Sequence, residues 1–130
     1  LGNARALLGF RDAGRARGAA LMRHPRVATD DGSVGYPGPV TDLLESEFAD
    51  DPAFVVYACG PPAMLESVRS LCEARGVTAQ LALESGMACG FGACFGCVVP
   101  TRRGYVRLCV DGPVLDAGML QSAAVAGAGH

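Results

Sequence analysis

The residues with the clearest chemical potential are four cysteines that lie within 21 positions of one another. They follow the pattern C-x4-C-x2-C, and the fourth comes after eleven further residues: Cys89, Cys94, Cys97 and Cys109. Glycines at positions 86, 90, 92 and 96 surround them. Glycine suits a loop that needs positive φ angles and a close approach of backbone N–H groups to sulfur. This spacing predicts a plant-type [2Fe-2S] cluster held by four thiolates.

A β-hairpin can bring the fourth cysteine to the third. Valines at 98, 99 and 106 flank a turn over positions 101–104 that ends in glycine, which is a hairpin pattern. If the hairpin is centred on Arg103, opposed positions sum to 206, and Cys97 faces Cys109. Opposed residues of an antiparallel pair have Cα atoms about 4.5–5.5 Å apart. The two thiolates are then close enough to share one iron.

Two other interpretations use the same cysteines. A structural zinc site also takes four thiolates but usually draws them from two C-x2–4-C knuckles, and Cys109 has no cysteine neighbour. Disulfides suit secreted proteins, but Cys94 and Cys97 are too close in a glycine-rich turn to be useful crosslinks. Cys59 and Cys72 stand apart from the group. The distribution favours an intracellular metal site, which we expect in the cytoplasm.

Composition excludes two classes of function. The 130 residues carry 11 basic and 13 acidic side chains, a formal charge of −2, so we expect no nucleic-acid partner. Half of the residues are apolar, but the apolar runs are far shorter than the roughly 20 residues that a bilayer-spanning helix needs. The chain starts at Leu1 without an apolar targeting segment. We expect it to begin inside a longer gene product.

The segments before the cysteines predict alternating strands and helices. Buried apolar runs predict strands at 5–10, 26–29, 54–57 and 78–84, and helical patterns fall at 12–23, around 40–48 and at 62–75, with a loop at 30–39. This order is typical of a doubly wound α/β unit with a parallel sheet. The predicted fold class is therefore α/β. It comprises a partial nucleotide-binding domain over 1–84 and a small Cys-rich domain with a hairpin and a C-terminal tail over 85–130.

Several of these segments carry expectations about burial. Apolar positions 40, 43, 44 and 48 share one helix face, which places Glu47 outside. The run 54–57 has no polar alternation, which indicates a strand covered on both faces. The helix over 62–75 buries Cys72 and shows Glu66, Arg69 and Glu73 to water. A chain of this size is not expected to bury 111–116, Met119 and Leu120 alone, so a partner is predicted to cover them.

Ligands of a doubly wound sheet bind at the carboxyl ends of its strands. Three segments follow strands directly: 9–12, 29–32 and 59–62. From the residues alone, Cys59 can equally be a small buried side chain, Asp30 and Asp31 turn formers, and Arg11 a solvated residue. No strand is followed by G-x-G-x-x-G, so the phosphate-binding turn of a dinucleotide fold is expected upstream of Leu1.

Several motifs resemble one family of flavoproteins. Residues 57–65 (YACGPPAML) resemble the C-G-P-x-x-M-[LM] segment of ferredoxin reductase-type NAD(P) domains. Residues 28–33 and 38–43 resemble the T-x-D-G-S loop of one branch. Residues 83–99 and 109–114 are similar to the electron transfer subunit of class B dihydroorotate dehydrogenase. The resemblance covers about residues 5–120.

The resemblance implies a function and a set of site residues. In that family a barrel binds FAD, the α/β domain binds NAD, and a [2Fe-2S] cluster passes electrons to a flavin-bearing catalytic subunit that oxidises dihydroorotate. It implies FAD and NAD in the full-length protein and a hetero-oligomer with that subunit. By resemblance, Cys59 and Gly60 border the reacting nicotinamide and flavin rings with Pro61 beside them, while Gly9, Arg11, Asp30 and Asp31 face the adenosine half.

Related proteins leave alternatives open. Electron transfer subunits of NAD-dependent sulfide dehydrogenase, ferredoxin:NADP oxidoreductase and hydrogenase share the C-G-P and C-x-D-G-P motifs. A non-enzymatic iron–sulfur electron carrier is a further alternative, with the α/β half purely structural.

The acidic pair after the strand at 26–29, Asp30 and Asp31, favours NAD over NADP as the nucleotide. A carboxylate at this position accepts hydrogen bonds from the ribose hydroxyls of NAD.

Overall fold

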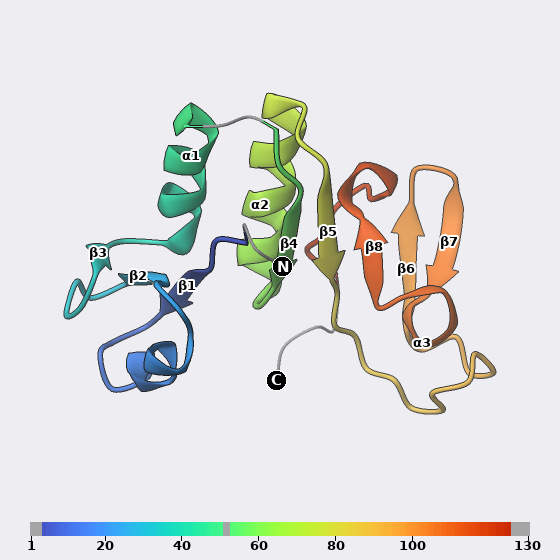
Figure 1. Cartoon of the computed structure of the whole chain (residues 1–130). Helices are drawn as coiled ribbons and strands as arrows, with labels where there is room; N and C mark the ends of the chain where they lie inside the picture. Colours follow the sequence, from blue (N-terminus) through green and yellow to red (C-terminus); the bar gives the residue numbers. More distant parts are fainter. Residues whose placement is uncertain (1–3, 51–52, 126–130) are drawn as a thin grey trace. The chain divides into compact units, whose positions relative to one another are not determined.

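The computed structural model describes residues 4–50 and 53–125 (Figure 1). The chain forms two compact units, Leu1–Pro52 and Ala53–His130, and each is described by itself. Both are mixed α/β with a three-stranded sheet that contains parallel strands. The units divide at a different place from the expected boundary at residue 84, which stays a prediction.

The first unit is a small parallel sheet covered by one helix. Its strands are β1 (Leu7–Phe10), β2 (Arg26–Thr29) and β3 (Tyr36–Pro37), in the order β1-β2-β3. Helix α1 (Val40–Asp50) packs against β1 and β2. Its apolar face is confirmed, because Leu43, Leu44 and Phe48 are all buried. Burial of each such side chain contributes about 1.5–3 kcal/mol.

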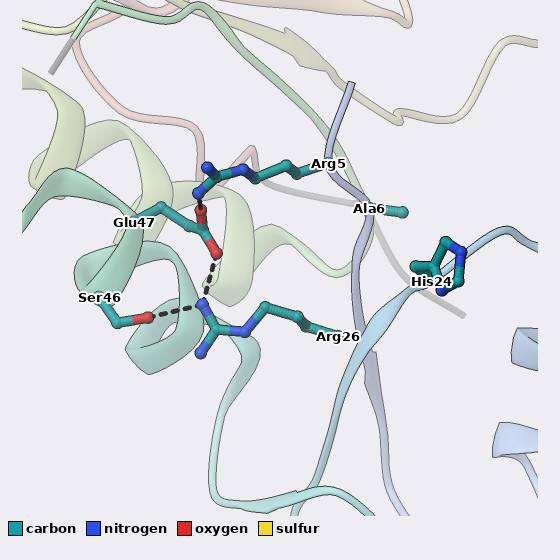
Figure 2. A pocket seen from close by; sticks show the side chains of 6 residues that line it. All are labelled: Arg5, Ala6, His24, Arg26, Ser46 and Glu47. Atoms are coloured by element: carbon teal, nitrogen blue, oxygen red, sulfur yellow. Dashed lines mark hydrogen bonds and ion pairs between the residues drawn. The ribbon is translucent and has the colours of Figure 1, made fainter. Parts of the chain in front are cut away.

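Glu47 differs from the expectation that it faces water. It is 6% exposed, and its carboxylate accepts hydrogen bonds from Arg5 and Arg26 (Figure 2). Arg26 also donates to Ser46 Oγ over 2.9 Å. These side chains line an open pocket together with Ala6 and His24. A buried carboxylate is tolerated here because two guanidinium groups compensate its charge. The hydrogen bond from Arg5 lowers the pKa of Glu47 and outweighs burial, which raises it.

The helix expected at 12–23 is wrong. This segment forms only a short 3-10 helix, η1 (Ala16–Leu21), and its N-cap residue Arg15 makes no side-chain capping hydrogen bond. Gly14 and Gly18 each weaken an α-helix by roughly 1 kcal/mol relative to alanine. Only Ala16 and Ala19 are buried, so little apolar area stabilises the segment. The loop at 30–39 is confirmed apart from the two residues of β3.

The second unit contains β4 (Val56–Cys59), α2 (Pro62–Arg75), β5 (Ala79–Ala82) and β8 (Val114–Asp116). The strand order is β4-β5-β8, in which β4 and β5 are parallel and β8 runs antiparallel to β5. Helix α2 packs against β4 and β5 and buries Leu65, Val68 and Cys72. Gly76 ends it in a left-handed conformation with φ of 65°, as the sequence predicts.

The strand expected at 54–57 is shifted and is not covered on both faces. It begins at Val56, and exposure alternates along it, with Tyr57 78% exposed. Helix α2 packs against β4, and a single helix covers one face of a strand. An apolar run can therefore leave alternate side chains open, and periodicity did not distinguish this case.

The Cys-rich part contains β6 (Val98–Thr101), β7 (Gly104–Arg107), the short helix α3 (Leu108–Asp111) and the 3-10 turn η2 (Ala117–Met119). Strands β6 and β7 form the expected hairpin, but Val98 pairs with Arg107, so opposed positions sum to 205 and the predicted register is wrong by one. No helix in the described part of the chain is long and apolar enough to cross a membrane.

The segment expected to need a partner for burial is packed in part within its own unit. Leu115 is 5% exposed and Leu120 is fully buried, whereas Val114 and Met119 are about half exposed. Strand β8 joins the sheet beside β5, and Arg102 donates its backbone N–H to the Met119 carbonyl over 2.8 Å. The expectation is therefore wrong for Leu115 and Leu120, which the chain buries itself, and contact of a partner with Val114 and Met119 stays a prediction.

Candidate metal centre

The thiols of Cys97 and Cys109 form a pair at the open end of the hairpin. Cys97 precedes β6, Cys109 lies in α3, and their Sγ atoms are 3.3 Å apart. Leu108 donates its backbone N–H to the Cys97 carbonyl over 3.1 Å, and the Cys109 N–H points to Cys97 Sγ at 3.5 Å. The expected juxtaposition is present despite the register error, because α3 turns the chain back over Cys97.

Cys89 and Cys94 form a second pair within the cysteine loop, which is residues 83–97 between β5 and β6. Backbone N–H groups of Cys94 and Phe91, followed by the Cys94 thiol, lower the pKa of Cys89 to about 6. The backbone N–H of Gly96 donates to Cys94 Sγ over 3.4 Å. Hydrogen bonds from N–H groups stabilise the thiolate form, which is the form that binds metals.

The two thiol pairs influence each other. The Cys109 backbone N–H, followed by its thiol, lowers the pKa of Cys97. The Cys97 thiol raises the pKa of Cys109, the negative charge of Cys89 adds to this, and a backbone hydrogen bond from Gly92 opposes it. The described residues contain no group of three or more His, Cys, Asp or Glu side chains already gathered around one metal position. The thiols therefore lie in two pairs, and the charge of Cys89 in one pair raises the pKa of Cys109 in the other.

The conformation of the cysteine loop requires glycine at one position above all. Gly92 has φ of 85°, and a Cβ atom there would lie 2.7 Å from Val110 Cγ2. Phe95 also has positive φ, at 58°, which is uncommon for a residue with a large side chain. The loop therefore turns sharply at both residues, which brings its N–H groups toward the sulfurs.

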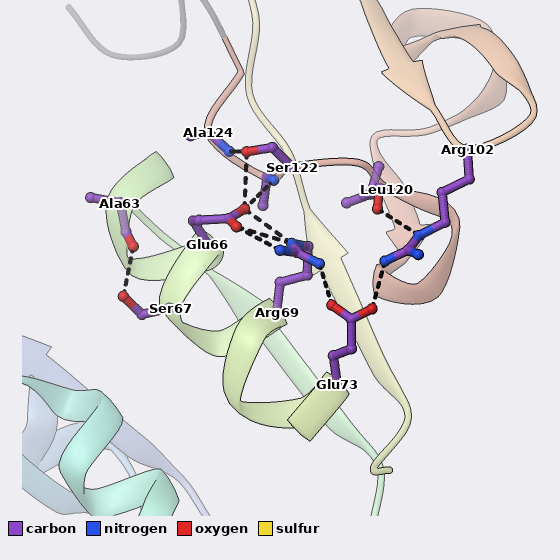
Figure 3. A network of polar contacts seen from close by, with 10 residues as sticks. Ala63, Glu66, Ser67, Arg69, Glu73, Arg102, Leu120, Ser122 and Ala124 are labelled. Atoms are coloured by element: carbon purple, nitrogen blue, oxygen red, sulfur yellow. Dashed lines mark hydrogen bonds and ion pairs between the residues drawn. The ribbon is translucent and has the colours of Figure 1, made fainter. Parts of the chain in front are cut away.

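A polar network holds the hairpin and the C-terminal segment to α2 (Figure 3). Arg69 bridges Glu66 and Glu73 on the helix, and Glu73 also accepts from Arg102 Nη2 over 2.6 Å. Glu66 accepts from Ser122 Oγ over 3.0 Å. Arg69, expected in water, has a side chain only 12% exposed.

This network was not predicted from the sequence. The spacing of residues 66, 69 and 73 on one helix was the available signal, since side chains three and four positions apart are neighbours. The contacts within α2 are therefore predictable from the sequence. Arg102 and Ser122 are distant in the sequence and join the network only through the tertiary fold.

The residues assigned to the adenosine half of the nucleotide lie together in the first unit. Asp30 donates its backbone N–H to the Phe10 carbonyl over 3.0 Å, and Asp31 donates to the Arg11 carbonyl over 3.3 Å. The Asp31 carboxylate accepts from the Ser33 Oγ and N–H, which lowers the pKa of Asp31. Asp30 and Asp31 are both exposed.

Gly9 has a packing role that is independent of any ligand. A Cβ atom at this position would lie 2.9 Å from Val40 Cβ at the start of α1. Any larger residue would push the helix away from β1. A place in the adenosine site stays a prediction for Gly9, because packing alone accounts for the glycine.

The residues assigned to the nicotinamide half lie in the second unit. Cys59 ends β4, and Gly60 and Pro61 lead into α2. Cys59 is exposed, so the alternative of a small buried side chain is wrong. Its proximity to a nicotinamide ring stays a prediction, because the adenosine-half residues belong to the other unit.

The fold of the chain is similar to part of a solved structure. A solved structure of an NADH-dependent reduced ferredoxin-NADP oxidoreductase matches with a TM-score of 0.69, covering 92% of this chain and 55% of that chain. The sequence identity is 21%, so this likeness concerns the fold alone.

The Cys-rich part matches a known family. Residues 84–121 match the model of the iron–sulfur cluster binding domain of dihydroorotate dehydrogenase B. An electron transfer subunit homolog of dihydroorotate dehydrogenase B (NAD(+)) from Aquifex aeolicus is 47% identical over 88 residues, 67% of this chain and 33% of that protein. The subunit from Bacillus caldolyticus is 47% identical over 102 residues, 76% of this chain and 38% of that protein. The match thus spans about a third of each relative's length, and the resemblance seen in the motifs is confirmed.

Proposed function

We propose that this chain carries the [2Fe-2S] cluster of an electron transfer protein, held by Cys89, Cys94, Cys97 and Cys109. The observation that carries the proposal is the approach of Cys97 and Cys109, with Sγ atoms 3.3 Å apart, beside a second thiol pair in the matched family region. Each iron of a two-iron cluster takes two thiolates beside its bridging sulfides. A single zinc ion needs all four thiolates around one point. Two thiol pairs therefore favour the cluster over zinc.

The residues around the thiols suit an anionic cluster. The backbone N–H groups of Gly96 and Cys109 point at sulfur, which stabilises negative charge without a counter-ion. Cys97 is 2% exposed, whereas Cys94 lies at the surface. A bound [2Fe-2S] cluster accepts and releases one electron at a time. The chain would shield one side of it from water and leave the other side open to a redox partner.

For the whole protein, we propose electron transfer between NAD(H), FAD and a flavin-bearing dihydroorotate dehydrogenase catalytic subunit. The names of the relatives support this assignment. In the bound nucleotide, Cys59, Gly60 and Pro61 would face the nicotinamide half, and Gly9, Arg11, Asp30 and Asp31 would face the adenosine half. The exposed Cys59 and the adjacent carboxyl ends of β1 and β2 are compatible with these roles.

The test is anaerobic purification of the full-length protein, with iron and acid-labile sulfide assays and the EPR spectrum of the reduced sample. Two irons and two sulfides per chain, with a rhombic signal after one-electron reduction, are expected. Stoichiometric zinc after anaerobic reconstitution with iron and sulfide would contradict the cluster. Retained FAD and reduction of the cluster by NADH separate the reductase subunit from a simple electron carrier.

A further inference from the structure

Arg107 joins the two parts of the cysteine site. It ends β7, two positions before Cys109, and its backbone N–H donates to the Asp111 carboxylate over 2.8 Å. Its Nη1 donates to the Gly92 carbonyl over 3.0 Å. Its guanidinium carbon lies 5.4 Å from the centre of the Phe95 ring. One side chain from the hairpin therefore contacts two of the three residues that have positive φ in the cysteine loop, Gly92 and Phe95 but not Gly90.

These contacts are of the kind that fix a loop. A guanidinium over an aromatic face contributes about 0.5–1 kcal/mol at an exposed site, and a charged hydrogen bond about 1.5–3 kcal/mol. The left-handed conformation of Phe95 costs roughly 1–2 kcal/mol. The Arg107 contacts are large enough to offset that cost. Gly92 in turn reaches Cys109 through its backbone N–H, so the loop and the thiol are held by the same contacts.

The guanidinium also brings a charge that is not neutralised locally. Among the residues that the structure describes, no carboxylate forms an ion pair with it, whereas Arg69 and Arg102 are both paired. Asp111 contacts the backbone of Arg107 rather than its side chain. Arg107 is only partly exposed, so solvent screens its charge incompletely.

We propose that Arg107 is a positioning residue of the cluster site, which anchors the cysteine loop through Gly92 and Phe95 and raises the reduction potential of the cluster by its positive charge. The inference rests on the proposed function. Reduction adds one negative charge to the cluster and its thiolates, and a nearby cation stabilises that form. Removal of the cation should therefore make reduction harder.

The test is an EPR-monitored redox titration of the anaerobically purified, cluster-loaded protein. Arg107→Gln is compared with Arg103→Gln, which removes the same charge from an exposed position in the hairpin turn, at the end opposite to the cysteines. Arg107→Gln should shift the potential to a lower value and shorten the half-life of the cluster in air. Arg103→Gln should match the unsubstituted protein. Equal potentials for the two variants would overturn the proposal.

Arg107→Lys separates charge from anchoring, and it decides the matter if Arg107→Gln does not load a cluster. Lysine keeps the charge but lacks the planar group that contacts Gly92 and Phe95 together. The variant should keep a potential close to that of the unsubstituted protein and lose the cluster faster. A half-life equal to that of the unsubstituted protein would overturn the anchoring role. Absence of iron and sulfide from the unsubstituted protein would instead refute the proposed function.

Discussion

The Sγ atoms of Cys97 and Cys109 lie 3.3 Å apart, although the two residues are separated by twelve positions and by a complete β-hairpin. The separation is closed by β6, β7 and the first turn of α3. Because a regular element sets this distance, the pair is formed by the fold of the chain itself. The pair Cys89 and Cys94, in contrast, depends on an irregular loop.

Replacement of Cys97 or Cys109 by serine should abolish the cluster. A serine oxygen is a poor substitute for a thiolate toward iron, and each substitution removes one of four ligands. Iron and sulfide per chain and the visible spectrum report the outcome. Cys72→Ser is the control, because Cys72 is 1% exposed on α2 and burial raises its pKa to about 11. Equal cluster loss in all three variants would refute the ligand assignment.

Gly92→Ala should reduce cluster occupancy more than Gly86→Ala. A Cβ atom at Gly92 would lie 2.7 Å from Val110 Cγ2 and would strain a residue with φ of 85°, whereas Gly86 faces open space. The two effects together cost about 2–4 kcal/mol. Iron content after anaerobic reconstitution measures the difference. Similar iron contents would show that the cysteine loop adopts another conformation around the cluster.

Glu66→Gln should destabilise the second unit by about 1–2 kcal/mol at neutral pH, because a charged acceptor is lost. Arg69 first, then the Ala123 N–H and Ser122, outweigh burial and lower the pKa of Glu66 to about 2, from an ordinary value of 4.5. A lowered pKa means that the stabilisation is complete above pH 4.5 and is lost as the pH falls toward 2.

Urea unfolding of the cluster-free protein at pH 7, 5 and 3 measures this dependence. The difference between the unsubstituted protein and Glu66→Gln should be constant from pH 7 to pH 5 and smaller at pH 3. Glu84→Gln, at an exposed position, is the control and should change stability by less than about 0.5 kcal/mol. A difference that does not depend on pH would show that the Glu66 carboxylate is not the source of the effect.

The full-length protein should prefer NAD over NADP, and Asp30→Arg should narrow the ratio of kcat/KM values by about tenfold, the equivalent of one charged hydrogen bond. The Asp30 side chain is exposed at the end of β2, where a ribose hydroxyl can reach it. Glu84→Gln, which removes a carboxylate at an exposed position outside the predicted nucleotide residues, is the control and should leave the ratio unchanged. Equal use of both nucleotides by the unsubstituted protein would refute this assignment.

Much of the fold was predictable because local signals agreed with the tertiary structure. Helix α2 begins at Pro62 and ends before Gly76 as the sequence predicts, and the apolar face of α1 is buried. The errors arose where tertiary contacts decided the outcome. Glu47 is buried because two arginines from elsewhere in the unit reach it. Residues 12–23 lack the apolar surface that would stabilise a helix.

The candidate site was predictable in its residues but not in its geometry. The cysteine spacing indicated a cluster, and the family match over 84–121 supports the same chemistry. The pairing of Cys97 with Cys109 came from an assumed register that is off by one. The sequence pattern of the two strands is the same whether two or three residues form the turn between them. The pattern therefore does not decide which residues pair, and no local sequence feature predicts that α3 brings Cys109 back to Cys97.

The pairing of β5 with β8 has a consequence for the segment between them. Ala82 lies opposite Val114, and Leu83 donates its N–H to the Pro113 carbonyl over 3.0 Å, so the chain enters and leaves 83–113 at one point of the sheet. The sheet therefore holds the two ends of this segment together. The pairing of β5 with β8 already includes the entropic cost of closing the loop over 83–113. Ordering of this segment around a cluster therefore adds no large loop-closure cost. Because its ends are fixed, the segment 83–113 can open locally for cluster insertion, or change in length, while β5 and β8 keep their register.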